Sequence, residues 1–145
     1  KMKRDYGVFH VGLKVLMQKG GEFLFLRDET GKIWDWPGGR IDNVEVKTPL
    51  GKIIAREIKE ELGSKVKYKL GPPIFQFRRY FKSRDIWIFQ TYYLAKYISG
   101  EIKLSREHTS YKWLNPKQIK TLKTNEFYGP RERKVFLNYL KTFRG

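Results

Sequence analysis

The stretch Arg56-Glu57-Ile58-Lys59-Glu60-Glu61-Leu62-Gly63 ends the strongest helix candidate in this chain of 145 residues. We expect the helix to run from about Pro49 to Leu62, with Thr48 as its cap and Gly63 at its exit. Proline suits the first helical position because the missing N–H has no helical partner there. At about 100° per residue, one side carries the apolar residues Ile54, Ala55, Ile58 and Leu62. A second side carries Glu57, Glu60 and Glu61, with Ile53 falling near these acids.

The three glutamates occupy positions i, i+3 and i+4, so we expect their carboxylates to converge on one patch of the helix. Like charges at this spacing destabilise a helix by roughly 0.2–0.5 kcal/mol per pair. They also lie in the last half of the helix, where the dipole disfavours negative charge. Two explanations remain open: the carboxylates bind a hard divalent cation such as Mg²⁺ through oxygen, or neighbouring Lys and Arg residues neutralise them.

The sequence before this helix adds a glycine-rich turn, Pro37-Gly38-Gly39, and an isolated acid, Glu45. Together with the helix they resemble the Nudix hydrolase signature: a glycine, five residues, a glutamate, seven residues, then Arg-Glu-aliphatic-x-Glu-Glu-x-Gly-aliphatic. Gly39 and Glu45 have this spacing. The Trp34-Asp35-Trp36-Pro37 stretch, Glu107-His108 and Trp113-Leu114 also resemble the layout of that family. The resemblance therefore spans most of the chain.

Three features depart from the signature. Ten residues, 46–55, separate Glu45 from Arg56 where the family has seven. Ser64 stands at the final aliphatic position, and Val44 replaces a glycine that usually precedes the glutamate. Because the insertion precedes the glutamate-bearing half of the helix, we expect it to shift Glu45 without disturbing Glu57, Glu60 and Glu61.

Alternating and apolar segments predict the remaining elements. We expect strands at 11–18, 23–26, 74–81 and 86–97, and a short strand ending at Trp113-Leu114. Asn115-Pro116-Lys117-Gln118 has the cap, proline and glutamine that open a short helix, and a last helix starts at Pro130 with Val135, Phe136, Tyr139 and Leu140 on one side. This order predicts an α+β protein. The resemblance implies a single Nudix domain over residues 1–145, an α/β/α sandwich with a mixed central sheet.

The resemblance implies a divalent-metal-dependent pyrophosphohydrolase that cleaves a nucleoside diphosphate linked to another group. Mg²⁺ or Mn²⁺ is the expected cofactor. The implied metal ligands are the Gly38 backbone carbonyl, Glu57, Glu60, Glu61 and, as a further candidate, Glu107, which is otherwise a capping or surface residue. Glu57 is our choice of general base, with Glu60 or Glu107 as alternatives. Arg56 orients Glu45 or Glu57.

Aromatic and basic side chains supply candidates for substrate binding. Tyr80 lies sixteen residues beyond Ser64, where dinucleoside polyphosphate hydrolases of this family carry a tyrosine, which favours a substrate such as diadenosine tetraphosphate. Tyr128 is a second stacking candidate. The expected phosphate-binding residues are Arg40, Arg78 and Lys82, with Arg79 and Arg84 nearby.

Lys and Arg number 31 against 15 Asp and Glu, a net charge of +16. Such a field attracts polyanions, although Lys-rich surfaces also serve solubility. The charge leaves two alternatives open: an RNA 5′ pyrophosphohydrolase or decapping-type Nudix enzyme, and a Nudix-like module that binds nucleotide or RNA without catalysis. The substrate, the general base and the oligomeric state are not determined by these residues.

The chain contains no cysteine and two histidines. The absence of cysteine excludes disulfides, Cys-based zinc or iron–sulfur centres and thiol catalysis. We expect His10 and His108 to be structural, since no cluster of metal-ligating residues surrounds either one in the sequence. Apolar runs are far shorter than the roughly 20 residues that span a bilayer, so we expect no membrane association and a cytoplasmic location.

Overall fold

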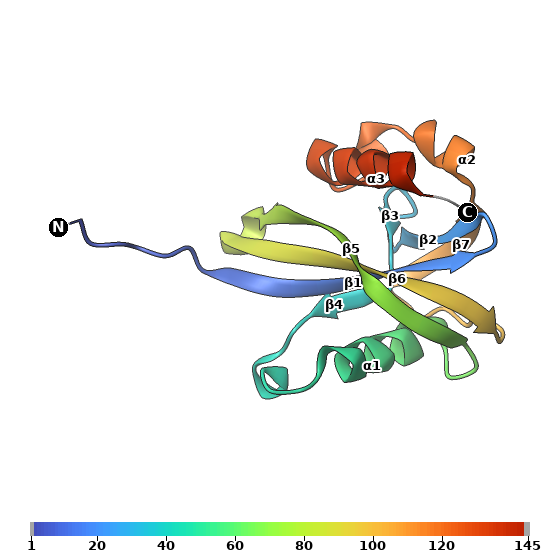
Figure 1. Ribbon diagram of the computed structural model, residues 1–145, viewed down its shortest axis with the longest axis horizontal. Coiled ribbons are helices and arrows are strands. Elements are labelled where there is room, and N and C mark those ends of the chain that lie inside the picture. The colour runs from blue at the N-terminus through green and yellow to red at the C-terminus, as the bar shows by residue number, and fades with distance from the viewer. Residues whose placement is uncertain (1, 144–145) are drawn as a thin grey trace.

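The computed structural model describes residues 2–143, which form a seven-stranded mixed sheet with helices on both faces (Figure 1). The strands are β1 (Phe9–Lys19), β2 (Glu22–Asp28), β3 (Trp34–Asp35), β4 (Gly38–Arg40), β5 (Lys67–Phe81), β6 (Ile86–Ser99) and β7 (His108–Leu114). The helices are α1 (Leu50–Leu62), α2 (Pro116–Lys120) and α3 (Pro130–Thr142). The strand order is β3-β2-β1-β6-β5, with β4 paired to β1 and β7 paired to β2. Only β1 and β6 run parallel among these pairs.

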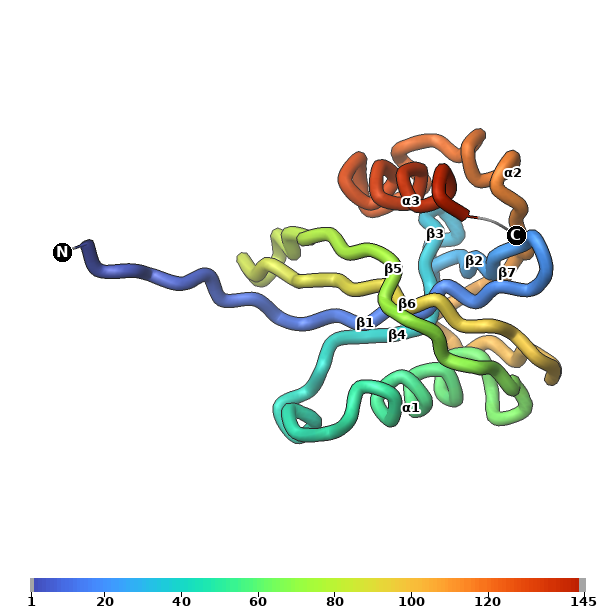
Figure 2. The backbone as a smooth tube through the Cα atoms, in the orientation of Figure 1, coloured from blue at the N-terminus to red at the C-terminus, as the bar shows by residue number. Residues whose placement is uncertain are grey.

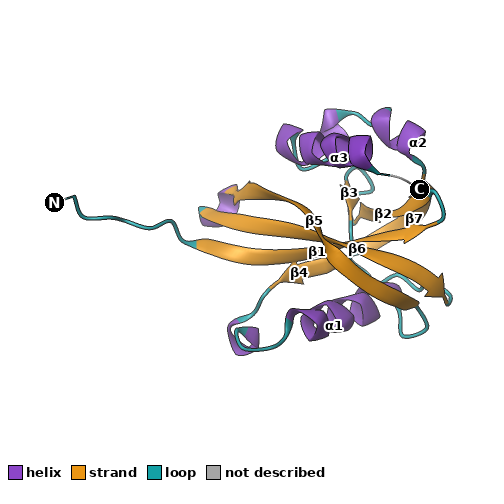
Figure 3. Cartoon of the chain, viewed as in Figure 1, coloured by secondary structure: helices purple, strands orange, loops and turns teal. Residues whose placement is uncertain are grey.

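The alternation of side chains along β1 divides the interior into two cores. Leu16 points to the face covered by α3, where it joins Phe25, Trp36 and Phe136. Leu13, Val15 and Met17 point to the opposite face, where α1 covers them. Figure 3 shows the resulting three layers, with α1 on one side of the sheet and α2 and α3 on the other. The expected α+β sandwich with a mixed central sheet is confirmed.

Helix α1 begins one residue later than predicted. It also turns a different side toward the sheet than the sequence predicted. Pro49, with ψ 136°, is still extended, and no side chain caps the helix. The prediction of Thr48 as the cap is therefore wrong; the Thr48 N–H instead donates to the Glu45 carbonyl. The buried stripe contains Ile53, Ile54, Ile58, Glu61 and Leu62, whereas Ala55 is exposed. The rotation brings Ile53 into the core because the helix packs Glu61 against the sheet.

Strand β5 is longer than expected because Gly71-Pro72-Pro73 does not interrupt it. Its register with β6 shifts on either side of Pro73. A proline is tolerated there because β5 lies at the edge of the sheet and need not donate on its outer side. β5 and β6 form the long twisted hairpin that is visible in the backbone trace of Figure 2.

Other local predictions are confirmed. Phe23, Leu24, Phe25 and Leu26 are fully buried. The Asn115 side chain accepts a hydrogen bond from the Gln118 N–H, and Gln118 reciprocates in a capping box. Helix α3 begins at Pro130 and buries Phe136 and Leu140. None of the helices within residues 2–143 combines the length and apolar character that crossing a bilayer requires.

Candidate active site

The glycine-rich turn brings the backbone of β4 directly against α1. The Gly38 N–H donates to Glu61 Oε2 at 2.5 Å. Gly38 has φ +141°, and a Cβ there would lie 1.9 Å from the Leu13 carbonyl oxygen. At Gly39 a Cβ would lie 2.8 Å from Glu57 Oε1. Gly38 is therefore needed for its positive φ and for the close approach of the β1 backbone, and Gly39 because the Glu57 carboxylate stands where a side chain would lie.

Arg56 links three carboxylates. Its Nε and Nη2 donate to the two oxygens of Glu45, each at 2.9 Å. Nη2 also reaches Glu57 Oε1 at 3.2 Å, and Nη1 reaches Glu60 Oε2 at 3.2 Å. Residues 46–49 absorb the three-residue insertion ahead of the helix, so Glu45 still reaches Arg56.

The three helix glutamates differ in how far their side chains are exposed to solvent. The Glu60 side chain is 57% exposed, that of Glu57 is 13% exposed, and that of Glu61 is 5% exposed. Burial raises the pKa of Glu57, although the charge of Arg56 opposes this. Burial likewise raises the pKa of Glu61 to about 7, against the opposing effect of Lys14. The helix rotation explains the division, because it turns Glu61 into the protein and Glu60 to solvent.

A buried charged network lies behind Glu61. Lys14 Nζ lies 3.0 Å from Asp35 Oδ1 and donates to the Trp36 carbonyl. His108 Nε2 lies 3.0 Å from Asp35 Oδ2, and His108 Nδ1 lies 3.9 Å from Glu61 Oε1. Burial alone would lower the pKa of Lys14 and raise that of Asp35. The attraction between the two groups, together with Glu61 for Lys14 and the His108 hydrogen bond for Asp35, shifts both pKa values the other way. Both groups therefore stay charged within this network.

Sequence reasoning did not identify Lys14 or Asp35 as part of the site. Lys14 interrupts the apolar run Leu13-Lys14-Val15-Leu16, and Asp35 stands between two tryptophans. A charged residue inside an otherwise buried segment was the available signal, because such a charge requires a partner. His108 was expected to be structural, and the structure places it in hydrogen-bond contact with Asp35 and close to Glu61.

The predicted metal ligands offer the right donor chemistry. Carboxylate and carbonyl oxygens suit hard divalent ions, and burial disfavours the charged form of Glu57, which a nearby cation would stabilise. In the arrangement present, Arg56 provides the positive charge between Glu57 and Glu60. Within residues 2–143, no three His, Cys, Asp or Glu side chains are grouped closely enough to hold one ion. Glu107 is exposed, and no ion pair or hydrogen bond joins its carboxylate to another described residue.

A small cationic pocket of about 130 Å³ adjoins these acids. The pocket is lined by Lys14, Gly39, Arg40, Arg79, Phe81, Ile88 and Gln90. Arg79 stacks on the Tyr128 ring at 3.6 Å, which places Tyr128 beside this pocket. Gln90 is 4% exposed, and its Oε1 has no hydrogen-bond partner among the described residues. The pocket therefore holds three cations and one free polar group next to Glu57.

The other expected substrate-binding residues lie elsewhere. Successive residues of a strand point to opposite faces, so Arg78 and Tyr80 face away from Arg79 and Phe81. The Tyr80 hydroxyl donates to Asp85 at 2.6 Å, and its ring lies 5.2 Å from that of Trp87. Lys82 is exposed in the turn between β5 and β6. Of the predicted substrate-binding residues, the structure brings Arg40, Arg79 and Tyr128 to the cationic pocket.

The fold, the glycine turn and the acid-bearing helix define a Nudix hydrolase. The chain belongs to this family: the NUDIX domain model matches residues 8–136. This membership places it among the Nudix pyrophosphohydrolases, enzymes that act on phosphoric anhydride bonds and generally need a divalent metal ion. No curated protein sequence is significantly similar to the chain.

Solved structures share the fold at low identity. A MutT protein from Methanosarcina mazei Go1 is 23% identical with a TM-score of 0.74, over 96% of this chain and 98% of that one. A possible asymmetric diadenosine tetraphosphate hydrolase from Jonesia denitrificans DSM 20603 is 12% identical with a TM-score of 0.72, over 95% and 98%. An ADP-ribose pyrophosphatase from Streptococcus suis 89-1591 is 15% identical with a TM-score of 0.67, over 95% and 94%. At these identities the similarity concerns the fold.

Proposed function

We propose that this chain is a Mg²⁺- or Mn²⁺-dependent pyrophosphohydrolase that cleaves a nucleoside diphosphate linked to another group. The observation that carries the proposal is the position of Glu57 beside a pocket containing Lys14, Arg40 and Arg79. Cations of this kind bind and orient the oxygens of a phosphate chain. The Glu57 carboxylate then lies close to the phosphate at which water attacks.

The residues of this chain divide the work of hydrolysis. Water attacks one phosphorus atom, and the bond from that phosphorus to the bridging oxygen breaks. The water oxygen stays on the attacked phosphate, and the bridging oxygen leaves with the other product. Glu57 is our proposed general base that accepts the proton of the attacking water, with Glu60 and Glu107 as alternatives. Arg56 is a positioning residue because it fixes the carboxylates of Glu45, Glu57 and Glu60.

Glu57, Glu60, Glu61 and the Gly38 carbonyl are the proposed metal ligands, with Glu107 as a further candidate. A divalent ion bound there neutralises phosphate charge and makes coordinated water more acidic. The Gly38 N–H holds the Glu61 carboxylate in place. The charge of Lys14 attracts this carboxylate, and His108 Nδ1 lies 3.9 Å from its Oε1.

The preference for dinucleoside polyphosphates depends on Tyr80. Because Tyr80 lies on the face of β5 opposite Arg79, it contacts a substrate at Glu57 only if that substrate wraps around the end of the sheet. The Tyr80→Ala variant tests this with diadenosine tetraphosphate. A raised KM supports the preference, and an unchanged KM removes it.

The RNA alternative has its own support. The net charge of +16 favours a long polyanion over a small nucleotide, because each neutralised phosphate releases counterions. An RNA 5′ pyrophosphate end would then occupy the same cationic pocket. A non-catalytic module would bind nucleotide without any metal-dependent product.

A panel of nucleotides and 5′-triphosphorylated RNA, incubated with Mg²⁺ or Mn²⁺ and analysed by product mass, tests the proposal. We expect metal-dependent release of a nucleoside or RNA monophosphate from one class. The Glu57→Gln variant should lose this activity, whereas Lys59→Gln, on an exposed position of the same helix, should keep it. Absence of turnover with every compound, with nucleotide still bound, would favour the non-catalytic module.

A further inference from the structure

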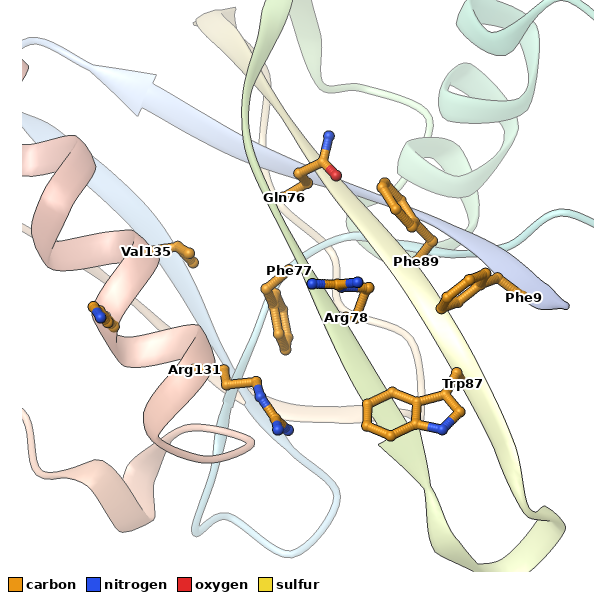
Figure 4. Close-up of a pocket in the computed structure, with 9 residues that line it drawn as sticks. Phe9, Gln76, Phe77, Arg78, Trp87, Phe89, Arg131 and Val135 are labelled. Carbon is orange, nitrogen blue, oxygen red and sulfur yellow. The ribbon is translucent and has the colours of Figure 1, made fainter. Parts of the chain in front are cut away.

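A hollow of about 740 Å³ lies at the edge of the sheet, apart from the cationic pocket. We call it the aromatic groove. Its aromatic lining consists of Phe9 on β1, Trp87 and Phe89 on β6, and Phe77 on β5. Figure 4 shows Phe9 and Phe89 side by side with Trp87 close to them. Phe9 and Trp87 expose their rings in this groove, whereas Phe77 is buried in the core that packs against α3.

Positive charge accompanies the rings. Arg78, Arg131 and Lys134 line the groove, and none of its nine lining residues is acidic. Arg78 lies opposite Phe89 across the β5–β6 pairing. The Arg131 guanidinium reaches from α3 to within 5.7 Å of the Trp87 ring centre, as Figure 4 also shows. Rings and guanidinium groups thus alternate along one concave surface.

We propose that the aromatic groove binds single-stranded nucleic acid. Aromatic rings stack on unpaired bases while cations follow the phosphate backbone, and both partners are present here. Trp87 is 39% exposed and Phe9 is 38% exposed, so their rings are accessible to bases that are not already paired. A duplex hides its base faces and would use the cations alone.

Two other occupants fit these features less well. In a symmetric dimer through the same patch, Arg78, Arg131 and Lys134 would meet their own copies, which like charges oppose. Insertion into an anionic membrane uses protruding side chains, whereas these rings line a hollow. A nucleic acid strand satisfies both the charge and the shape.

A further hollow shares lining residues with both the groove and the cationic pocket. A second hollow, at the start of β1, is lined by Phe9, Arg40 and Arg84 among others. It shares Phe9 with the aromatic groove and Arg40 with the cationic pocket. A nucleic acid that follows this path from the groove toward Glu57 would pass Arg84 and Arg40, with Asp42 as the one acidic residue among the described residues that line the connecting hollow. This path extends the RNA alternative of the proposed function, but binding in the groove does not require catalysis.

The test measures anisotropy of a fluorescein-labelled single-stranded oligouridylate in EDTA, so that no turnover occurs. We expect Trp87→Ala to weaken binding by about tenfold, from the loss of one stacked base, and Trp87→Phe to restore most of it. Tyr111→Ala is the matched control, because Tyr111 is 41% exposed on β7 at the other side of the sheet. It should bind as the wild type does.

Charge is tested separately from stacking. Arg131→Glu with Lys134→Glu should weaken binding and reduce its salt dependence, compared with Lys112→Glu and Lys117→Glu, which change the net charge equally. Wild-type affinity in Trp87→Ala, or equal affinity for duplex and single strand, would overturn the proposal. So would an effect of Trp87→Ala on self-association or on phosphatidylserine vesicle binding with RNA binding unchanged.

The experiments test the groove proposal and the catalytic proposal independently of each other. Glu57→Gln should lose turnover and keep oligouridylate affinity in EDTA. Trp87→Ala should keep turnover of a small nucleotide while it loses oligouridylate affinity. If no nucleotide is turned over, the loss of RNA binding in Trp87→Ala still supports the groove.

Discussion

Arg56 and Glu45 form a two-pronged ion pair, in which Nε and Nη2 of the guanidinium donate to both carboxylate oxygens at 2.9 Å. The pair forms across ten intervening residues, three more than the family signature has. Because a fork of this kind fixes direction as well as distance, Glu45 orients Arg56. Arg56 in turn orients Glu57 and Glu60.

Replacing the Arg56 guanidinium group by an ammonium group should impair catalysis more than folding. In Arg56→Lys the ammonium keeps the charge but cannot bind three carboxylates in fixed directions. We expect kcat to fall by about tenfold or more, with little change in KM or Tm, because Arg56 is partly exposed. Lys52→Arg, on an exposed position of the same helix, is the control. Steady-state kinetics with wild-type kcat in Arg56→Lys would contradict the positioning role.

The two candidate bases of α1 should differ in importance. We expect Glu57→Gln to lower kcat by roughly 10²–10⁴-fold, the usual contribution of a general base. Glu60→Gln should cost less, since Glu60 faces solvent and Glu57 lies against Gly39. The exposed Glu101→Gln controls for the loss of one negative charge. A larger loss in Glu60→Gln than in Glu57→Gln would transfer the base role to Glu60.

Gly→Ala variants of the Pro37-Gly38-Gly39 turn should distinguish effects on stability from effects on catalysis. Gly39→Ala places a Cβ 2.8 Å from Glu57 Oε1, so it should displace that carboxylate and lower kcat while Tm changes little. Gly38→Ala meets the Leu13 carbonyl at 1.9 Å and has φ +141°, so it should lower Tm strongly. Gly21→Ala, with open space around the added Cβ, should affect neither. Thermal melts beside kinetics decide whether Gly39→Ala acts on the site or on the fold.

Glu132 should make stability fall as pH rises. It is fully buried, and burial raises its pKa to about 7 although the Tyr92 hydroxyl and the Tyr128 N–H donate to it. Below the unfolded pKa of 4.5, Glu132 is protonated in both the folded and the unfolded protein, so it does not lower the free energy of unfolding. As the pH rises toward 7, the unfolded state loses its proton before the folded state does. The free energy of unfolding therefore falls, by about 3 kcal/mol once the pH exceeds the folded pKa.

Glu132→Gln removes this titration. The variant should gain stability relative to the wild type as pH increases, with the gain complete above about pH 7. Urea unfolding at pH 5 and pH 8 measures the difference. A stability difference that is the same at both pH values would show that Glu132 does not titrate in this range.

The local features of this protein could be predicted from its sequence alone. The spacing of Gly39, Glu45 and the Arg56–Gly63 block identified the family, and the alternation in β1 and the Asn115 capping box predicted their elements. These features depend on residues that are near neighbours along the backbone, where sterics and short hydrogen bonds decide conformation. They were therefore readable without the fold.

Tertiary packing decided the rest. The rotation of α1 buried Ile53 and Glu61 and exposed Ala55, because the helix face is chosen by what the sheet offers and not by helical periodicity alone. The buried contacts of Lys14 and His108 with Asp35 join residues far apart in the chain, and the strand pairing of β5 set Arg79 and Tyr80 on opposite faces. Charge pairs and pockets of this kind depend on distances between separate elements, which only the assembled sheet and helices fix.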